Sequence, residues 1–580
     1  MAGIQKLNRL LAKEFGGRIS AVPERGHLAL RGESADWGEI VRAGHLAAKH
    51  NKSAGVVNDV HFTGQASAPT RLPCETDCSL EGASPDVLVI GGGVVGCAVA
   101  RELSRSRLDI LLVEKECDVA LHASSRNDGM IHPGLDIRKG SQKYDYNKRG
   151  NRMFGKTCAA LGVDFTQNGQ YLCFPKKMPF FVLYLSLPYW KWMGIPAKVL
   201  SRRQLFAREP GLHPALHCAL YFPSAGSVCP YGLTIAYAEN AIENGAALSL
   251  STAATGMELR DGRITAVHTN RGTVHPRVVV NAAGVFSEEI AAMAGDRFFS
   301  IHPRRGTNSI CDKKVSDRIA RNHCSTLLTG SSKGAHTKGG GVIRTVHDNL
   351  LIGPNAEESP EKEDFSTRRE SIDAIFAKQA KTSEKLRQGQ IITYFTGIRA
   401  ATFEEDFVVR PGLYTENIIH CAGIQSPGLT AAPALGVAVA KMAVQALEAQ
   451  SGETVQPNAA FNPVRAPIPS CARLDDAARE ALIRENPDYG VILCRCEEIS
   501  RGEILAALRR PLPCGTVDGV KRRVRAGMGR CQGGFCGPQV AQLIAQEKGI
   551  PLARVRKSGE GSELLFGETK AALREEGEDA

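Results

Sequence analysis

Three features are missing from this 580-residue sequence, and each absence excludes a class of protein. The start, MAGIQKLNRLLAKEFGG, carries charged residues where a signal peptide needs an apolar core, so we do not expect export. The longest apolar stretch, residues 178–190, is too short to span a bilayer and contains two prolines. No basic tract with interleaved aromatic residues occurs, so the sequence predicts no nucleic-acid partner.

The composition itself is that of a folded globular protein. Hydrophobic residues make up 43% and charged residues 23% of the chain, which excludes a disordered, collagen-like or coiled-coil protein. The net charge of +11 favours plain solubility, with an anionic substrate, cofactor or membrane surface as the alternative. The 17 cysteines mostly stand alone in apolar contexts and indicate reduced thiols with one metal site. We therefore predict a cytoplasmic protein.

The length predicts several domains. Residues 27–32 and 54–60 have strand patterns and 37–49 has the period of an amphipathic helix, so residues 1–65 form a small αβ module. This module resembles the phospholipid-associated BON type, although the residues favour a plain accessory domain. Composition then predicts a linker at 66–84, a large α/β region at 85–450, a proline-rich linker at 451–470, a compact cysteine-bearing domain at 471–555 and a charged tail at 556–580.

The large region begins with a dinucleotide-binding pattern. A buried strand at 86–90 is followed by Gly91-Gly-Gly93-Val-Val-Gly96, a helix at 97–104 and a second strand at 108–113 that ends at Glu114. Gly91 makes the tight turn, Gly93 lets the backbone approach a pyrophosphate, and Gly96 lets helix and strand pack. Glu114 accepts from ribose hydroxyls and would repel a 2′-phosphate, so the ligand is FAD or NAD rather than NADP.

Further motifs follow in a fixed order and carry a family resemblance. They are His122-Ala-Ser-Ser-Arg-Asn127-Asp-Gly129-Met-Ile-His132-Pro-Gly134, Asn147-Lys-Arg-Gly150, Pro230-Tyr-Gly-Leu-Thr234, Val280-Asn281-Ala-Ala-Gly284, Pro303-Arg-Arg-Gly306, Val346-His347-Asp-Asn-Leu-Leu-Ile-Gly353-Pro354, Phe395-Thr-Gly397-Ile-Arg399 and Ala422-Gly423-Ile-Gln-Ser426-Pro427-Gly428-Leu429-Thr430. Over about 85–445, this series resembles the FAD-dependent glycerol-3-phosphate dehydrogenase and L-2-hydroxyglutarate oxidase group of the glycine-oxidase-like flavoproteins.

The resemblance implies an α/β fold in which a Rossmann-like FAD-binding domain is interleaved with an antiparallel-sheet substrate domain. It also implies FAD as cofactor and oxidation of a carbon that bears a hydroxyl or amine, with hydride transfer to flavin N5. The residues that it would place along the cofactor are Ser125, Asn127, Gly129, Gly284, Gly397, Gly423, Gly428, Leu429 and Thr430.

Substrate oxidation needs a cation for an anionic substrate group and a base for the hydroxyl proton. Arg399 is our candidate clamp, because a guanidinium binds carboxylate or phosphate through two parallel bonds. His132 is the candidate base, with a structural histidine as the alternative, and His347 is a weaker candidate. Lys333 and Arg344 are candidate additional cations.

Two features depart from the better-known members of the group. Asn-Asp-Gly stands at 127–129 where Asn-Ser-Gly is common, and residues 180–192 are unusually apolar. We interpret the apolar segment as a helix of the substrate domain that packs on a core or on another protein chain. The alternative is a quinone or peripheral membrane contact through 178–192, on the inner face of the membrane.

A second redox centre is predicted near the C-terminus. Cys494, Cys496, Cys531 and Cys536 form two close pairs, and four thiolates hold iron or zinc. The surrounding residues 525–538 resemble the bacterioferritin-associated-ferredoxin-like (BFD-like) [2Fe-2S] domain, which implies a small helical iron-sulfur domain. The basic run 521–525 would offset cluster charge. A structural zinc site is the alternative, and we interpret Cys74, Cys78 and Cys514 as free thiols.

These observations lead to one favoured function and two alternatives. We expect an FAD-dependent dehydrogenase of a small anionic hydroxy compound, of glycerol-3-phosphate or 2-hydroxy-acid type, which passes electrons through the [2Fe-2S] cluster to a quinone, ferredoxin or partner flavoprotein. The first alternative is an amine or imino-acid dehydrogenase of proline, hydroxyproline or sarcosine type. The second is a non-catalytic electron-transfer subunit.

Overall fold

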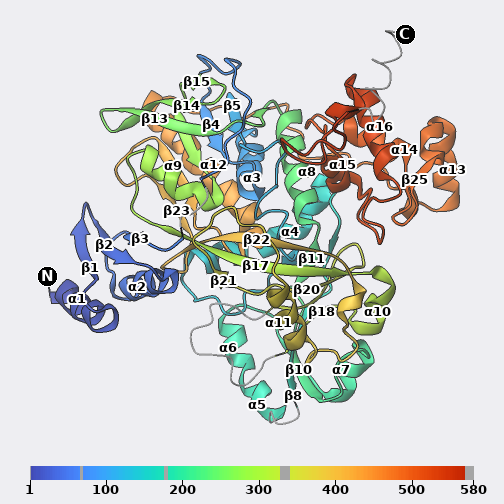
Figure 1. Ribbon diagram of the computed structural model, residues 1–580, viewed down its shortest axis with the longest axis horizontal. Helices are drawn as coiled ribbons and strands as arrows, with labels where there is room; N and C mark the ends of the chain where they lie inside the picture. Colours follow the sequence, from blue (N-terminus) through green and yellow to red (C-terminus); the bar gives the residue numbers. More distant parts are fainter. Residues whose placement is uncertain (1, 66–68, 176–179, 327–339, 568–580) are drawn as a thin grey trace, which may run out of the picture. The chain divides into compact units, whose positions relative to one another are not determined.

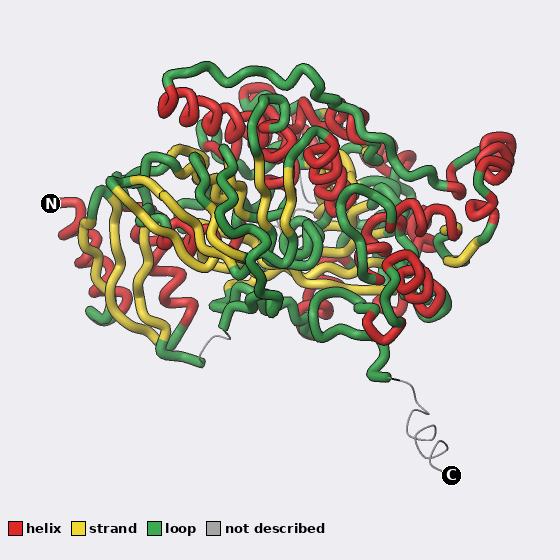
Figure 2. Tube along the Cα trace, turned by 90° about the horizontal axis from the view of Figure 1, so that it is seen from above, coloured by secondary structure: helices red, strands yellow, loops and turns green. Residues whose placement is uncertain are grey.

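The computed structural model describes residues 2–65, 69–175, 180–326 and 340–567 (Figure 1). Its described residues form two units, one running to Lys115 and from Val119 to Val464, the other from Arg465 onward together with Glu116–Asp118. Figure 2 shows strands lying in layers between helices. Both α/β character and the mixture of parallel and antiparallel sheets agree with the fold class expected from the motifs.

The first unit contains a six-stranded sheet in the order β12-β5-β4-β16-β24-β23. Its strands are parallel except β23 at the edge. The bounds are β4 Val87–Ile90, β5 Ile110–Val113, β12 Ala247–Ser249, β16 Val278–Asn281, β23 Val408–Pro411 and β24 Ile418–Ala422. Every residue of β4, β5 and β16 is buried, as runs of Val, Leu and Ile, followed in β16 by Asn281, predict for strands covered on both faces. The expected order of strand, glycines, helix α3 (Val94–Leu103) and second strand is confirmed.

Helix α12 (Gly428–Ser451) follows β24 and packs on α3 and on α4 (Gln142–Leu161). It is long and apolar enough to cross a membrane, and no other helix in the described part of the chain is. More than half of its apolar window, 56%, is buried inside the protein. The apolar sequence of α12 is therefore accounted for by its place in the core.

A second, longer sheet is built largely from strands that lie between those of the first in the sequence. Its order is β21-β17-β20-β19-β18-β8-β10-β9, and β22 pairs with β17. The bounds are β8 Gln170–Pro175, β9 Lys198–Leu200, β10 Leu216–Phe222, β17 Ile301–Cys311, β18 His323–Thr326, β19 Gly341–Arg344, β20 Leu350–Gly353, β21 Glu357–Glu358 and β22 Ile391–Thr402. All pairs are antiparallel except β18 with β8. The interleaving of the two sheets is that of the expected fold.

Shorter elements complete this unit. They are β6 Met130–Ile131, β7 Phe165–Thr166, β11 Gly226–Val228, β13 Ala254–Arg260, β14 Arg263–Thr269, β15 Gly272–Val274, α5 Phe180–Leu185, α6 Leu187–Trp192, α7 Arg202–Arg208, α8 Pro230–Glu243, α9 Ser287–Met293, α10 Ser316–Ile319 and α11 Arg369–Gln379. The apolar segment thus forms two short helices instead of the single helix we expected. Pro188 explains the break, because it lacks an N–H group and fits only the first turn of a helix, here that of α6. Residues 178 and 179 lie outside the described residues.

The N-terminal module has the order α1 Ala2–Phe15, β1 Ile19–Glu24, β2 His27–Ser34, α2 Trp37–His50 and β3 Val56–Phe62. Its sheet has β2 in the centre, antiparallel to β1 and parallel to β3. Asp36 caps α2 by accepting from Gly38 N. Phe403, from the β22–β23 turn, completes the apolar core of this module.

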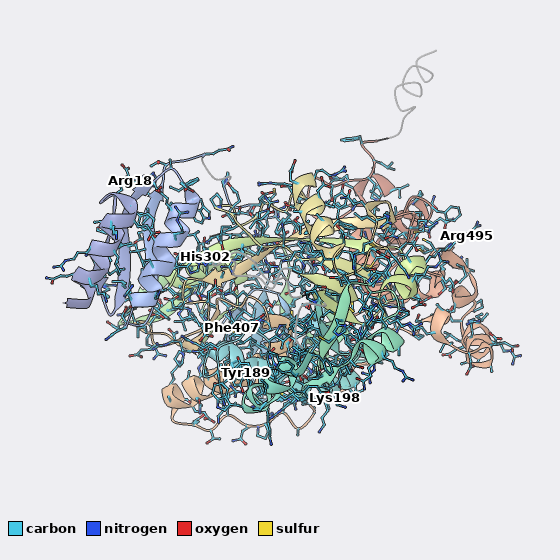
Figure 3. The ribbon with its side chains drawn as sticks, turned by 90° about the horizontal axis from the view of Figure 1, so that it is seen from below. Arg18, Tyr189, Lys198, His302, Phe407 and Arg495 are labelled. Carbon is cyan, nitrogen blue, oxygen red and sulfur yellow. The ribbon has the colours of Figure 1, made fainter. Side chains whose placement is uncertain are left out.

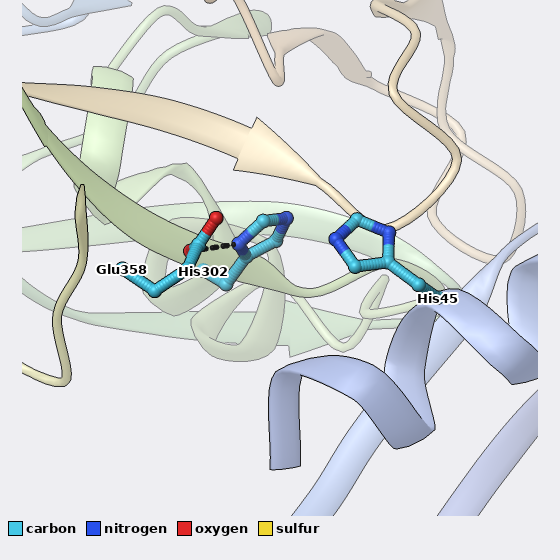
Figure 4. Close-up of side chains that lie close together, drawn as sticks. All are labelled: His45, His302 and Glu358. Atoms are coloured by element: carbon cyan, nitrogen blue, oxygen red, sulfur yellow. Dashed lines mark hydrogen bonds and ion pairs between the residues drawn. The ribbon is translucent and has the colours of Figure 1, made fainter. Parts of the chain in front are cut away.

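Polar contacts also join the N-terminal module to the β22–β23 turn. His45 Nδ1 lies 3.1 Å from Phe403 O, and Val56 N donates to Glu404 Oε1 at 2.8 Å. Figure 4 shows His45 of α2 beside His302, whose Nδ1 lies 2.8 Å from Glu358 Oε2. The His302 ring also stacks on Phe403, with centroids 4.6 Å apart. The module is therefore fixed to the sheet through β17 and the β22–β23 turn.

The second unit is small and mainly helical. Its elements are α13 Asp476–Glu485, β25 Ile492–Cys494, β26 Ile499–Ser500, α14 Arg501–Leu508, α15 Val517–Val524 and α16 Gly537–Lys548. Ile504, Val520 and Ile544, one from each of three helices, are fully buried in a common core. Ser500 and Glu503 form a capping box at the start of α14.

Candidate active site

The turn after β4 excludes side chains at two of its glycines and leaves room at a third. A Cβ on Gly91 would lie 2.5 Å from Ala282 O, and one on Gly96 would lie 1.9 Å from Gly91 O. A Cβ on Gly93 would meet only Ser124 Oγ, at 3.2 Å. Protein packing therefore requires Gly91 and Gly96, whereas the space over Gly93 is open to a ligand, as a pyrophosphate needs.

Two side chains accept hydrogen bonds from backbone N–H groups of this turn. Glu114 Oε2 accepts from Gly92 N at 2.6 Å, which holds the carboxylate at the end of β5 where ribose hydroxyls are expected. Ser124 Oγ accepts from Val94 N at 2.9 Å, in the first turn of α3. Ser124 therefore lies at the N-terminus of α3, where the unpaired N–H groups of a helix can bind phosphate. The sequence reasoning named its neighbour Ser125, whose hydroxyl instead lies 3.4 Å from His122 O.

The loop that follows is held in place by Asn127. Its Nδ2 donates to Ala123 O and Ser124 O, and its Oδ1 accepts from Gly129 N at 2.9 Å. Gly129 has a φ of +66°, which a side chain rarely adopts. The loop lies directly on β22, since a Cβ on Gly397 would be 2.2 Å from Arg126 O. Asn127, Gly129 and Gly397 are thus brought together.

The start of α12 adjoins the strand after this loop. His132 N donates to Thr430 Oγ1 at 2.8 Å. Pro427, the residue before this helix, makes no side-chain cap hydrogen bond, so the partly positive N-terminus formed by Gly428, Leu429 and Thr430 is not capped by its own N-cap residue. Gly423 packs closely, with a would-be Cβ 2.7 Å from Thr402. Gly284 has open space around it but a φ of +59°.

Two arginines face each other on the long sheet. Arg304 on β17 is directly opposite Arg399 on β22. Arg304 donates to Glu358 Oε1 and to Glu405 Oε1, each at 2.6 Å, and to Gln425 in the loop before α12. Its charge is therefore neutralised by two carboxylates, and it ties β17 to the Gly423–Thr430 loop.

Arg399 has a different environment. Its guanidinium donates to Arg305 O at 3.4 Å and to Asn355 O at 3.0 Å, and no carboxylate of the described residues forms an ion pair with it. Burial, together with the charge of Arg304, lowers its pKa to about 10, so it stays protonated at neutral pH. The negative charges of Asp128, Glu358 and Glu405 act in the opposite direction and partly offset this lowering of the pKa. A buried guanidinium whose hydrogen bonds go to carbonyl groups of the described residues is suited to bind an anion.

His132 lies at the end of β6 and is buried. Its Nδ1 accepts from Gly134 N at 2.9 Å. Because a backbone N–H can only donate, the neutral ring carries its proton on Nε2. This tautomer makes Nε2 a hydrogen-bond donor, whereas the expected base role needs an Nε2 without a proton.

His347 is separated from these groups. It lies in the β19–β20 turn, just before Leu350, and Leu350 is paired with Cys311 on β17. Arg399 is paired with Arg304 on the same strand. Cys311 and Arg304 are seven residues apart along β17, which is roughly 23 Å. Arg344 pairs with Asp317 and Asp348, both at 2.7 Å, so it is not an uncompensated cation. Lys333 lies outside the described residues.

The four predicted cysteine ligands lie together in the second unit. Cys496 Sγ is 4.0 Å from Cys494 Sγ and 3.7 Å from Cys531 Sγ, and Cys536 precedes the first residue of α16. With Arg495 and Phe535 these cysteines line a pocket of about 170 Å³. Four thiols converging on one pocket fit a thiolate-held cluster.

Small residues and backbone N–H groups surround these thiols. The N–H groups of Gly527 and Glu497 bond to the Cys494 sulfur, and those of Phe535 and Gly533 bond to the Cys531 sulfur. A Cβ on Gly529 would be 2.5 Å from Cys496 Sγ. Such donors stabilise the negative charge of a thiolate cluster, as the glycine-rich sequence predicts.

The basic run beside the cysteines is largely paired with carboxylates. Arg523 Nη1 lies 2.8 Å from Asp118 Oδ2, and Arg525 Nε lies 2.9 Å from Glu497 Oε2. Asp118 belongs to the second unit through the segment Glu116–Asp118. Arg495, which lines the pocket of the four cysteines, is exposed and lies 4.6 Å over the Phe535 ring.

Comparisons with known proteins agree with these sites. Residues 86–442 match a family described as FAD dependent oxidoreductase, and residues 492–546 match a BFD-like [2Fe-2S] binding domain. A glycerol 3-phosphate dehydrogenase of Caloramator mitchellensis is 36% identical over 84% of this chain and 99% of its own length. One subunit of the anaerobic glycerol-3-phosphate dehydrogenase of Escherichia coli K12 is 25% identical over 80% of this chain and 88% of its own.

Among solved structures, the dithionite-reduced L-alpha-glycerophosphate oxidase from Mycoplasma pneumoniae, with FAD bound, has the same fold. Its TM-score is 0.57 at 24% identity, and the match covers 66% of this chain and 98% of that one. The resemblance inferred from the motifs is thereby confirmed. The chain belongs to the FAD-dependent oxidoreductase family, is an enzyme with FAD and a [2Fe-2S] cluster as its cofactors, and has glycerol-3-phosphate dehydrogenases among its relatives.

Proposed function

We propose that this enzyme oxidises glycerol 3-phosphate, a small anionic hydroxy compound. The observation that carries the proposal is Arg399, a protonated guanidinium held by two carbonyl groups and opposite the neutralised Arg304. The relatives named above, by their names, act on glycerol 3-phosphate. An uncompensated guanidinium in the substrate domain is what a phosphate or carboxylate substrate requires.

Arg399 would bind the anionic group of the substrate through two N–H bonds and so fix the orientation of its carbon chain. His132 would donate from Nε2 to the substrate oxygen, because its Nδ1 already accepts from Gly134. The hydroxyl proton then needs another acceptor. The carboxylate of Asp128 is the acceptor we propose, because its loop packs on β22, the strand that carries Arg399.

FAD would be held by the turn Gly91–Gly96, by Glu114 and Ser124, by the 127–129 loop and by the N-terminus of α12. It supplies a two-electron acceptor when bound, and the cluster, held by Cys494, Cys496, Cys531 and Cys536, supplies a one-electron carrier. A two-electron centre joined to a one-electron carrier suits delivery to a separate acceptor. We infer that electrons pass through the cluster to a quinone, a ferredoxin or a partner flavoprotein.

The assembly and location are further proposals. The Escherichia coli relative is by its name one subunit of an enzyme, which supports hetero-oligomeric assembly with an electron-accepting partner. A cytoplasmic location remains our expectation. The BON-type resemblance of the N-terminal module also remains a prediction.

An amine or imino-acid dehydrogenase is the second candidate. A substrate of this kind also carries a carboxylate for Arg399, and the negative charge of Asp128 would attract its ammonium group. A non-catalytic electron-transfer subunit is a third candidate, which no contact among the described residues specifically favours.

A substrate panel under anaerobic conditions separates these candidates. The purified holoenzyme is mixed in turn with glycerol 3-phosphate, glycerol, L-2-hydroxyglutarate and L-proline, and flavin absorbance is followed. We expect rapid bleaching with glycerol 3-phosphate and none with uncharged glycerol. Bleaching by L-proline alone would support the imino-acid function, and no bleaching by any of them, with dithionite still effective, would favour the electron-transfer role.

A further inference from the structure

Helices α5 and α6 present large apolar side chains to solvent. Phe181 is 68%, Leu185 74% and Trp192 60% exposed, and Tyr184 and Tyr189 are each about half exposed. These five residues, which we call the α5–α6 apolar face, lie within 12 consecutive positions. Large apolar side chains gathered on one exposed face usually mark a contact surface.

The opposite side of the two helices is firmly packed. Leu183 and Met193 are buried in a cluster with Phe222, and the Trp190 ring meets Phe222 edge-on with centroids 5.0 Å apart. Trp190 Nε1 also donates to Ser186 Oγ at 3.2 Å. The inner residues therefore anchor the helices, and the outward direction of the α5–α6 apolar face is fixed by this packing.

The surroundings of this face are basic. No Asp or Glu occurs between Phe165 and Arg208. Lys191 and Lys198 are exposed, and Figure 3 labels Lys198 together with Tyr189. Lys139, from the loop before α4, lies 3.9 Å over the Trp192 ring and donates to Trp192 O.

That loop also holds Asp136, an exposed acidic residue accompanied by the exposed Arg138 and Lys139. The charge around the apolar face is therefore positive on balance, which fits an anionic partner.

We propose that the α5–α6 apolar face docks on the surface of an anionic phospholipid bilayer. Trp and Tyr side chains with lysines beside them are typical of the membrane interface, where the rings enter the headgroup region and the ammonium groups meet lipid phosphates. Each helix has six residues, too few to cross a bilayer, so the segment would lie in the interface. Docking of this kind depends neither on the substrate nor on the electron relay.

The test is flotation of the full-length holoenzyme with vesicles. One set contains phosphatidylcholine alone, and the other contains phosphatidylcholine with phosphatidylglycerol. We expect binding to the anionic vesicles that weakens with salt, and at least a tenfold lower bound-to-free ratio for the triple variant Phe181→Ser, Leu185→Ser, Trp192→Ser. The control is a second triple variant, which removes exposed apolar side chains elsewhere and should bind as the unmodified protein does. Its substitutions are Leu259→Ser, Tyr394→Ser and Val464→Ser.

Flavin content and thermal midpoint show whether a variant is folded. If the triple variant is not, Lys191→Glu with Lys198→Glu replaces it and should also weaken binding to anionic vesicles. The proposal is overturned if the unmodified protein does not bind anionic vesicles or if the folded variants bind as well as it does. It is also overturned if sedimentation without lipid shows a dimer that the triple variant abolishes, because the face would then cover a second copy of the chain.

Discussion

Arg304 and Arg399 lie directly opposite each other on β17 and β22, yet of the two only Arg304 forms ion pairs with carboxylates of the described residues. Glu358 and Glu405 neutralise Arg304, while the hydrogen bonds of Arg399 within the described part of the chain go to the carbonyl groups of Arg305 and Asn355. Like charges on neighbouring strands repel, and the pairing of Arg304 with two carboxylates reduces this repulsion. The remaining charge on Arg399 is the basis for an anionic substrate.

Replacing Arg399 with Lys tests this basis. The charge remains, but an ammonium group cannot make two parallel bonds to a phosphate. We expect kcat/KM for glycerol 3-phosphate to fall about 10- to 100-fold, the range of a charge-assisted hydrogen bond. Arg368→Lys, at an exposed arginine, is the control and should be unchanged. Full activity of Arg399→Lys would remove Arg399 from the substrate site.

His132 is predicted to act as a donor. Glutamine can place an N–H group near the position of Nε2, so His132→Gln should keep more of the flavin-reduction rate than His132→Ala. If His132 were the base instead, both variants should lose about 10² to 10⁴-fold. Stopped-flow measurement of flavin reduction distinguishes these outcomes. A change confined to FAD content would mark His132 as a cofactor contact.

Asp128→Asn tests the proposed proton acceptor. Asn preserves the oxygen that accepts from Met130 N, so the loop should keep its shape. The rate of flavin reduction should fall by about 10² to 10⁴-fold. A variant that retains the rate of flavin reduction would rule out Asp128.

Glu405 links pH to stability. Burial opposes its ionisation, but hydrogen bonds and the positive charge of Arg304 outweigh burial and lower its pKa to about 2. A lowered carboxyl pKa stabilises the fold above the unfolded pKa of about 4.5, and this contribution is lost as pH falls from there toward 2. At neutral pH the lowered pKa of Glu405 contributes about 3 kcal/mol to the free energy of unfolding. The difference in urea midpoint between the unmodified protein and Glu405→Gln should therefore be large at pH 7 and shrink below pH 4.5. A constant difference would contradict this assignment.

Much of the fold and of the cofactor sites could be predicted because the signals are local. Gly91, Gly96 and Glu114 are fixed by a strand, a turn and a helix that adjoin in sequence. The two close cysteine pairs, with glycines in and beside the second pair, likewise indicate a metal site from the local sequence alone. These features need no knowledge of distant contacts.

The rest depends on residues far apart in the sequence. That Ser124, and not Ser125, reaches the start of α3 follows from how the loop returns to the β4 turn, and two adjacent serines carry no signal for it. The net positive charge at the two opposed arginines depends on the pairing of Glu358 and Glu405 with Arg304. The orientation of the His132 ring depends on one backbone N–H group. Sequence patterns do not contain these contacts.

Cys531→Ala separates substrate oxidation from onward electron transfer. The variant should lose the [2Fe-2S] signal, keep its FAD and still be reduced by glycerol 3-phosphate, because the flavin site lies in the first unit and the cysteines lie in the second. Transfer to an artificial two-electron dye should persist, while transfer to a one-electron acceptor protein should fall. Cys514→Ala, at a buried thiol outside the ligand set, is the control.

The most direct test of the central claim is anaerobic titration of the holoenzyme with glycerol 3-phosphate. Flavin absorbance and the electron paramagnetic resonance signal of the reduced cluster are recorded on the same samples. In the unmodified protein, we predict that the flavin bleaches and that the cluster signal appears with it. In Cys531→Ala, we predict that the flavin bleaches and that no cluster signal appears. A flavin that stays oxidised with glycerol 3-phosphate, or a reduced flavin beside a cluster that stays oxidised, would contradict the proposed function.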